Sequence, residues 1–212
     1  GETLIETDLD NLTTAISKDI AHDYQVNHPP FDKLHKLTTA DGYHYTAHGF
    51  VNGHRKSENA IPGFDLLILD CDGDVNISTV KILLEDYAFL ISTTKRHTPE
   101  INRFRLILPI SHRLKLSSNE YSRFMVNVFE WLPFPVDEAA KDIARKWASH
   151  PGHYEYNQGS VIDATMFIPE TKRSDETKAQ ISATGVGNIE RWFKTHTSKG
   201  NRANHLYRYG MV

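Results

Sequence analysis

The sequence predicts an α/β (α+β) fold with a mixed or largely antiparallel central sheet flanked by helices, followed by a small C-terminal helical appendage. Three apolar runs, residues 64–69, 87–93 and 104–110, have the length and composition of buried strands. One helical pattern joins the first two runs and a short polar loop joins the last two. Because a short loop connects antiparallel strands, a purely parallel sheet is not expected.

The region before residue 60 is expected to contain one helix and one strand. Residues 2–25 suit a helix that ends at His28-Pro29-Pro30, because a residue that precedes proline avoids the α conformation. Residues 43–51 alternate and are rich in aromatic side chains, which predicts a strand. Asn52-Gly53 is then a turn signal.

Strands and helices alternate after residue 60. Residues 64–69 are almost continuously apolar, which predicts a central strand buried on both faces. Further strands are expected at residues 87–93, 104–110 and 161–168. Helices are expected at residues 79–86, 119–131 and 138–147, and Ser78 is the expected N-cap of the first.

Three segments are expected along the chain. Residues 1–170 would form the domain with the main core, and residues 171–187 are polar, as is typical of a linker. Residues 188–212 contain two short helical patterns, which predict the start of a helical C-terminal domain. The second pattern is still amphipathic at Val212, from which we expect that the natural protein continues.

Composition excludes several classes of protein. A charged fraction of 24% with ten Phe and nine Tyr is typical of a folded, soluble chain. No window has the roughly 18 consecutive apolar residues of a membrane span, and no secretory signal is visible, so we expect a cytoplasmic protein without a membrane partner. The single cysteine, Cys71, excludes an internal disulfide and CxxC metal pairs. Because the net charge is −3, a nucleic-acid surface would need local basic segments, for which residues 95–113 and 141–146 are candidates.

The most informative motif is Asp70-Cys71-Asp72 at the end of the apolar run 64–69. Carboxylates at positions i and i+2 of an extended chain lie on the same face. Carboxylate oxygens in this arrangement suit a hard cation such as Mg²⁺, which also takes phosphates as ligands. The alternative is an ordinary strand-end turn, in which Asp and Gly are common, and Asp74 has this role most simply.

A second group of polar residues follows the strand expected at 87–93. Thr94, Lys95 and His97 precede the next strand, on which Arg103 and Arg105 share a face. Cations and hydroxyl groups together suit a triphosphate. The alternative is an exposed basic hairpin with no ligand.

A third group lies around residue 137. Asp137 is a candidate third metal carboxylate, but it is equally well placed to cap the helix expected to begin at Glu138. Lys146 belongs to the basic segment that follows and is a further candidate for nucleotide binding. Spacing alone does not separate the two interpretations of Asp137.

The order of these three groups resembles the archaeo-eukaryotic primase superfamily, particularly the primase-polymerases of phages and plasmids. The resemblance rests on LLILDCDGD, ISTTKRHTPEINRFRLILP and PVDEAAKDIARKW and covers roughly residues 43–170. GNRANHLYRYG, within residues 188–212, resembles the start of the helical domain that follows the catalytic domain. One departure is that Lys95 and Arg96 stand where the family often has a serine before His97, so that the hydroxyl role falls to Thr94 or is absent.

The resemblance implies template-directed nucleotidyl transfer, as in a DNA primase or DNA polymerase. It implies two divalent cations, Mg²⁺ or Mn²⁺, held by Asp70, Asp72 and Asp137. The partners it implies are a single-stranded DNA template, an NTP or dNTP, and a helicase in cis or in trans. The location it implies is the cytoplasm, that of the host cell if the protein is phage-encoded.

Two other functions fit parts of the sequence. LILDCDGD and LISTTKR also resemble motifs of haloacid-dehalogenase-type phosphatases, in which Asp70 would be the nucleophile, although no later acidic pair at a strand end is evident. An all-parallel sheet with Asp70 at a topological switch point would favour the phosphatase. A replication-initiator module that binds DNA without catalysis would use the same basic segments but has no need of Asp70 and Asp72.

Overall fold

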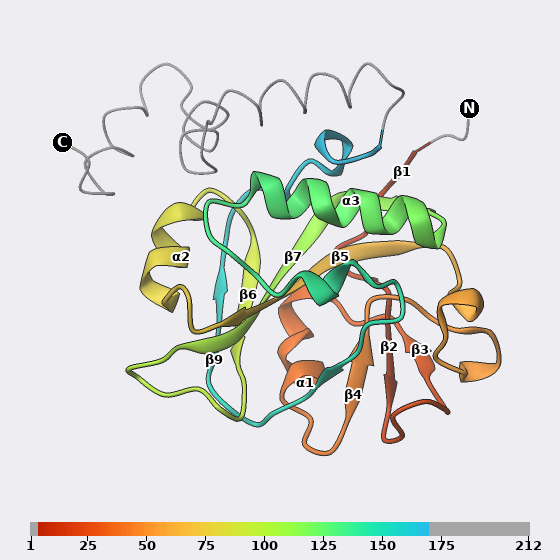
Figure 1. Ribbon diagram of the computed structural model, residues 1–212, viewed down its shortest axis with the longest axis horizontal. Coiled ribbons are helices and arrows are strands. Elements are labelled where there is room, and N and C mark those ends of the chain that lie inside the picture. Colours follow the sequence, from red (N-terminus) through yellow and green to blue (C-terminus); the bar gives the residue numbers. More distant parts are fainter. Residues whose placement is uncertain (1–3, 170–212) are drawn as a thin grey trace.

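The computed structural model describes residues 4–169, which form two antiparallel sheets and three α-helices (Figure 1). The larger sheet contains β1 (Ile5–Glu6), β5 (Phe64–Asp72), β6 (Phe89–Thr93), β7 (Arg103–Leu114) and β9 (Tyr154–Asn157). The smaller sheet has the order β3-β2-β4-β8 and contains β2 (Thr14–Ser17), β3 (Gln25–Asn27), β4 (His44–Thr46) and β8 (Trp147–Ala148). The helices are α1 (His35–Thr38), α2 (Ile77–Leu83) and α3 (Ser118–Trp131).

The long strand β7 organises the larger sheet. It pairs with β5 along one edge and with β6 and β1 along the other, and β9 continues the sheet beyond β6. All these pairs are antiparallel, so the predicted α+β fold with a largely antiparallel central sheet is confirmed. The expected strands at 64–69, 87–93 and 104–110 correspond to β5, β6 and β7.

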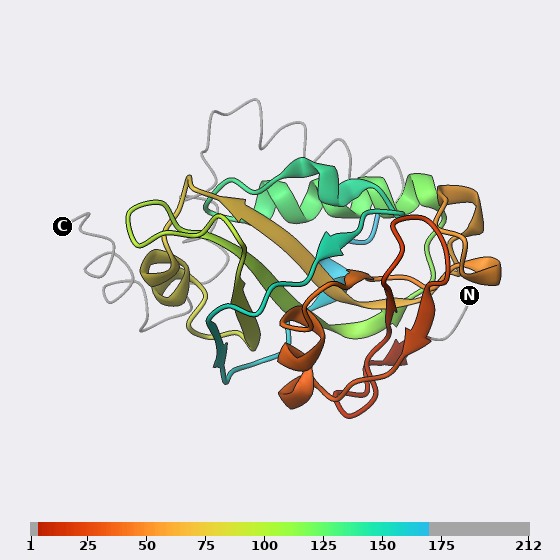
Figure 2. The same cartoon turned by 90° about the horizontal axis from the view of Figure 1, so that it is seen from below.

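The sheets and helices form layers. Figures 1 and 2 show α3 along one side of the larger sheet, and the smaller sheet with α1 on the other side. Residues 64–69 of β5 are buried throughout, as expected for a strand covered on both faces. On α3, Phe124 and Val128 are fully buried, and a capping box between Ser117 and Glu120 fixes the start of the helix.

The helix predicted over residues 2–25 is wrong, because this region forms β1, β2 and the beginning of β3. Short polar side chains bind nearby backbone N–H groups and favour turns: Asp8 accepts from the N–H of Asp10, and Asp19 accepts from those of Ala21 and His22. Thr14 is fully buried in β2, where a β-branched side chain packs well.

Two later elements also differ from the prediction. Residues 138–147 form only a 3-10 helix at Glu138–Lys141, because the chain then extends and β8 pairs with β4. Residues 161–168 contribute one bridge, from Ile162 to Ile110, and the Asp163 side chain then caps the 3-10 helix Ala164–Met166. In both places tertiary pairing and a local cap outweigh the sequence pattern.

The remaining expectations are close to the structure or lie outside it. The helix predicted at 79–86 is α2, which begins at Ile77 because the Asn76 side chain, and not Ser78, accepts the capping hydrogen bond from the N–H of Thr79. The helix predicted at 119–131 is α3. The strand predicted at 43–51 is shorter, at β4. The linker and helical segment expected at 171–187 and 188–212 lie outside the described residues.

Candidate metal and nucleotide site

Two aspartates of β5 face two arginines of β7. In the antiparallel register Asp70 lies opposite Arg105 and Asp72 lies opposite Arg103, so all four side chains share one face of the sheet. The Nε atom of Arg105 is 3.0 Å from Oδ1 of Asp70, and the Nε atom of Arg103 is 2.7 Å from Oδ1 of Asp72. The sequence predicts the two aspartates and the two arginines as separate groups. The strand register brings the two groups together into one cluster of alternating charge.

A pocket of about 560 Å³ opens over this cluster. Asp70, Asp72, Arg103 and Arg105 line it from the larger sheet, and Lys95 and Arg96 line it from the β6–β7 hairpin. Thr94 also lines it, and the remaining wall is Asp41, from the loop before β4, and residues 148–151, which begin at the end of β8. The pocket therefore lies where the two sheets meet. No sequence motif marked this remaining wall, because its place depends on the packing of one sheet against the other.

Burial raises the pKa of Asp70 above its usual value, although the Arg105 guanidinium opposes this shift. The negative charges of Asp137 and Asp72 raise the pKa of Asp70 further, so the three carboxylates are close enough to repel one another. Such a site is stabilised by positive charge, from the arginines or from a bound cation.

Asp137 lies beside Asp70 but outside the pocket lining. Its backbone N–H donates to the carbonyl oxygen of Asp70 over 2.9 Å. Its side chain caps the 3-10 helix by accepting from the N–H of Ala139, and its Oδ2 is 3.5 Å from Nη2 of Arg145. The helix-cap interpretation is therefore confirmed, and the same contacts hold Asp137 next to the pair on β5.

The carboxylates fit a divalent cation only in part. Asp70 and Asp72 offer oxygen ligands on a common face, and Asp137 adds a third negative charge nearby. Each carboxylate contacts an arginine, however, and among residues 4–169 no group of three or more His, Cys, Asp or Glu side chains is arranged to hold a metal ion.

The turn at Gly73 separates Asp72, which lines the pocket, from Asp74, which does not. Gly73 has φ +99°, which a residue with a side chain rarely adopts, and a Cβ there would lie 3.0 Å from Cγ2 of Ile101. Asp74 follows on the exposed side of this turn and does not line the pocket. Asp74 is thus a residue of an ordinary strand-end turn, which is the alternative to a metal ligand expected from the sequence.

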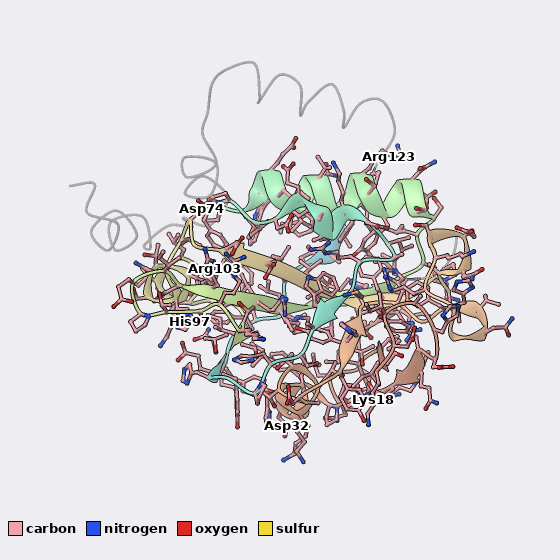
Figure 3. All side chains as sticks on the ribbon, turned by 60° about the horizontal axis from the view of Figure 1, so that its bottom comes forward. Lys18, Asp32, Asp74, His97, Arg103 and Arg123 are labelled. Carbon is pink, nitrogen blue, oxygen red and sulfur yellow. The ribbon has the colours of Figure 1, made fainter. Side chains whose placement is uncertain are left out.

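His97 and Thr94 shape the β6–β7 hairpin. The Nδ1 atom of His97 accepts from the backbone N–H of Arg103 over 3.1 Å, and Thr94 donates from both N and Oγ1 to the carbonyl oxygen of Arg103. A neutral imidazole that accepts at Nδ1 carries its proton on Nε2. His97 thus orders the turn and offers Nε2–H as a hydrogen-bond donor, but it is not among the residues that line the pocket. Figure 3 shows His97, Arg103 and Asp74 at the same end of the molecule.

Lys146 does not line the pocket. Its Nζ atom is 3.4 Å from Nδ1 of His44, on the smaller sheet. Burial lowers the pKa of Lys146, and the positive charges of Arg55, Arg145 and Arg105 lower it further. The structure therefore brings Thr94, Lys95, Arg103 and Arg105 together around the pocket and places Lys146 in a different cationic group.

Comparisons with protein-family models, with curated proteins and with solved structures find no match to this chain. None of the helices within residues 4–169 has the length and hydropathy of a membrane-spanning segment.

Proposed function

We propose that this chain catalyses template-directed nucleotidyl transfer, as a primase-polymerase that uses Mg²⁺ or Mn²⁺. The observation that carries the proposal is the cluster of Asp70, Asp72, Arg103 and Arg105, which puts cation ligands and phosphate ligands in one pocket. A nucleoside triphosphate with a bound divalent cation presents both kinds of charge. The substrate is an NTP or dNTP, and the template is single-stranded DNA.

Asp70, Asp72 and Asp137 would hold the divalent cations, whose charge favours the attacking hydroxylate and neutralises the leaving pyrophosphate. Arg103 and Arg105 bind the triphosphate. Each contacts its aspartate through Nε and a backbone carbonyl oxygen through Nη1, which positions the guanidinium groups beside the pocket. Such positioned donors give most of the rate enhancement in phosphoryl transfer.

The other residues of the hairpin extend the phosphate site. Lys95 and Arg96 are exposed at the pocket and add positive charge. His97 donates from Nε2 to a phosphate oxygen, and Thr94 fixes the hairpin that carries these side chains. Since Nε2 carries the proton of the neutral ring, His97 is a phosphate ligand and not a metal ligand.

A primer-synthesis assay tests the proposal. The protein is mixed with single-stranded DNA, labelled NTP or dNTP, and Mg²⁺ or Mn²⁺, and incorporation is followed on a gel. The Asp74→Ala variant is the matched control, because it removes a carboxylate from the same turn outside the pocket. Loss of incorporation in Asp70→Ala with retention in Asp74→Ala is the expected result. Absence of incorporation by the wild type with every nucleotide and metal would contradict the proposal.

One observation favours a second candidate, a module that binds nucleic acid without catalysis. Arg105 and Arg103 already balance the negative charges of Asp70 and Asp72, so the two carboxylates do not need a bound cation to be neutralised. The two candidates differ in their response to metal, because a cation bound only to the native state raises the melting temperature. A rise with Mn²⁺ that the Asp70→Ala variant lacks favours the enzyme. The phosphatase alternative gains no support, since every strand pair in the larger sheet is antiparallel.

A further inference from the structure

A second group of basic side chains lies beside the pocket, next to its wall on β8. It consists of His44, Arg55, Arg145 and Lys146, which we call the edge cluster. His44 comes from β4, Arg145 and Lys146 come from the segment before β8, and Arg55 comes from the loop before β5. Three segments distant in sequence thus bring basic side chains to one place.

Direct contacts hold the edge cluster together. Nζ of Lys146 is 3.4 Å from Nδ1 of His44. Arg55 donates from Nη1 to the carbonyl oxygen of Ala144 over 2.8 Å, next to Arg145 in the chain. Nη2 of Arg145 is 3.5 Å from Asp137. The positive charges of Lys146 and Arg55 add to burial in lowering the pKa of His44, which shows that the groups are close in space.

Among the described residues one carboxylate pairs with the edge cluster, that of Asp137 with Arg145. Within residues 4–169, neither Lys146 nor Arg55 has a carboxylate oxygen within 4.0 Å. Asp19 is the nearest acidic influence on His44, but its Oδ1 already accepts from the backbone N–H groups of Ala21 and His22. A cationic group that is partly buried and unbalanced is stabilised by an anionic ligand.

The position of the edge cluster indicates which anion it binds. β5 pairs with β7 on one edge, where Arg103 and Arg105 lie, and Asp137 bonds to the backbone of β5 at Asp70. The segment that follows Asp137 leads through Arg145 and Lys146 to β8. Lys146 is two residues before Ala148, which lines the pocket and pairs with His44, so the edge cluster continues the positive charge of the pocket beyond Arg105. If Arg103 and Arg105 hold the triphosphate, the edge cluster is placed for the phosphates of a strand that extends beyond the nucleotide.

We propose that the edge cluster binds the phosphate backbone of a single nucleic-acid strand, and that Lys146 serves the strand and not the incoming nucleotide. The ligand is a polyanion, recognised by charge without base contacts. The inference rests on the proposed function for its orientation, but its test measures binding alone.

Fluorescence anisotropy with a labelled single-stranded oligothymidylate tests the inference in the full chain. The Arg145→Ala/Lys146→Ala variant is expected to bind about tenfold or more weakly at low salt, and its plot of log affinity against log salt should be shallower by about 1.4, since each lost phosphate contact contributes about 0.7. Lys115→Ala/Arg123→Ala is the control. It removes two exposed cations, Lys115 just before α3 and Arg123 on α3, and should bind as the wild type does. Figure 3 shows Arg123 at the opposite end of the molecule from Arg103 and His97.

Three further measurements make the outcome decisive. Melting temperatures show whether the variants fold. Lys146→Gln removes one charge at nearly constant size, and its plot of log affinity against log salt should be shallower by about 0.7, half of the change expected for the double variant. The affinity for a fluorescent nucleotide with Mn²⁺ should not change in Lys146→Gln. The inference is overturned if strand binding is unchanged, if the control loses as much, or if only nucleotide affinity falls. Normal strand binding that depends on the edge cluster, in a protein that incorporates no nucleotide, would instead refute the proposed function alone.

Discussion

The two ends of the β5–β7 pair use the same residue types in opposite ways. At the first end Asp65 is 2% exposed, and both of its oxygens accept from the backbone N–H of Thr13, at 2.9 and 3.1 Å. Arg113 donates to the hydroxyl of Thr13 and lies near this carboxylate. At the second end Asp70 and Asp72 face arginine side chains alone, and the Asp72 side chain is 61% exposed.

The comparison shows what makes an Asp–Arg cluster available for a ligand. The first end is closed, because Phe64, Tyr121 and the ring of His48 pack together around it. The second end opens into a pocket, because β5 ends at Asp72 and Gly73 turns the chain away. Charge type alone does not distinguish the two ends. Backbone donors and aromatic cover make one structural, and free space makes the other a candidate binding site.

Removing one carboxylate at the open end should have the largest effect. Asp70→Ala or Asp72→Ala is expected to reduce nucleotide incorporation by about a thousandfold or more, equivalent to about 4 kcal/mol of transition-state stabilisation. Repulsion among carboxylates alone predicts an unchanged or higher melting temperature. The ion pairs change this expectation for Asp70→Ala, since Arg105, whose side chain is 14% exposed, would lose its partner at a cost of about 1–3 kcal/mol. If the Asp70→Ala/Asp72→Ala double variant incorporates nucleotide at the wild-type rate, these two residues do not hold the catalytic metal.

At the closed end, Asp65→Asn should change the dependence of stability on pH. Burial raises the pKa of Asp65 to about 6, although the N–H of Thr13 and the charge of Arg113 oppose the shift. Because the folded state binds this proton more tightly than the unfolded state, with its ordinary pKa of 3.8, the contribution of Asp65 to stability is present in full below pH 3.8 and is lost as the pH rises through 6.

The free energy of unfolding of the wild type, relative to Asp65→Asn, should therefore fall by up to about 3 kcal/mol between pH 4 and pH 7. Urea titrations of both proteins at several pH values measure this difference. A difference that stays constant over the range would show that folding does not raise the pKa of Asp65.

At the same end of the β5–β7 pair, His48 should make stability depend on pH in the opposite direction, and His48→Phe tests this. His48 is fully buried, neither ring nitrogen has a hydrogen-bond partner within the described residues, and burial lowers its pKa to about 3. The unfolded state therefore binds an extra proton between pH 3 and 6.5, and the wild type loses stability as the pH falls through this window. Relative to the variant, the wild type should lose about 2 kcal/mol between pH 7 and pH 5. Equal pH profiles for the two proteins would mean that His48 has no lowered pKa.

The smallest expected effect concerns His97 at the open end. His97→Ala removes the proposed Nε2–H donor and should weaken nucleotide binding about tenfold, or about 1.4 kcal/mol, with little change in Mn²⁺ affinity. The control is His153→Ala, which removes a largely exposed imidazole that precedes β9 and is not part of the β6–β7 hairpin. If the melting temperature falls and nucleotide affinity does not, His97 only orders the hairpin through Arg103.

The sequence by itself determined the elements whose patterns are strong and local. Apart from Asp65, residues 64–69 of β5 are apolar, and the Ser117–Glu120 box begins α3, so neither depends on distant residues for its prediction. The alternation of side chains also put Asp70 with Asp72, and Arg103 with Arg105, on common faces. These are properties of a few neighbouring residues.

Only the tertiary structure decided how these pieces meet. The register of β5 against β7 set each aspartate opposite an arginine, and the packing of the second sheet supplied Asp41 and residues 148–151. Residues 2–25 became strands because their partners lie elsewhere in the chain, and β8 formed where a helix was expected because β4 offered it a free edge. Lys146 was assigned to the edge cluster and not to the pocket for the same reason. Such contacts join residues far apart in sequence, and no local pattern records them.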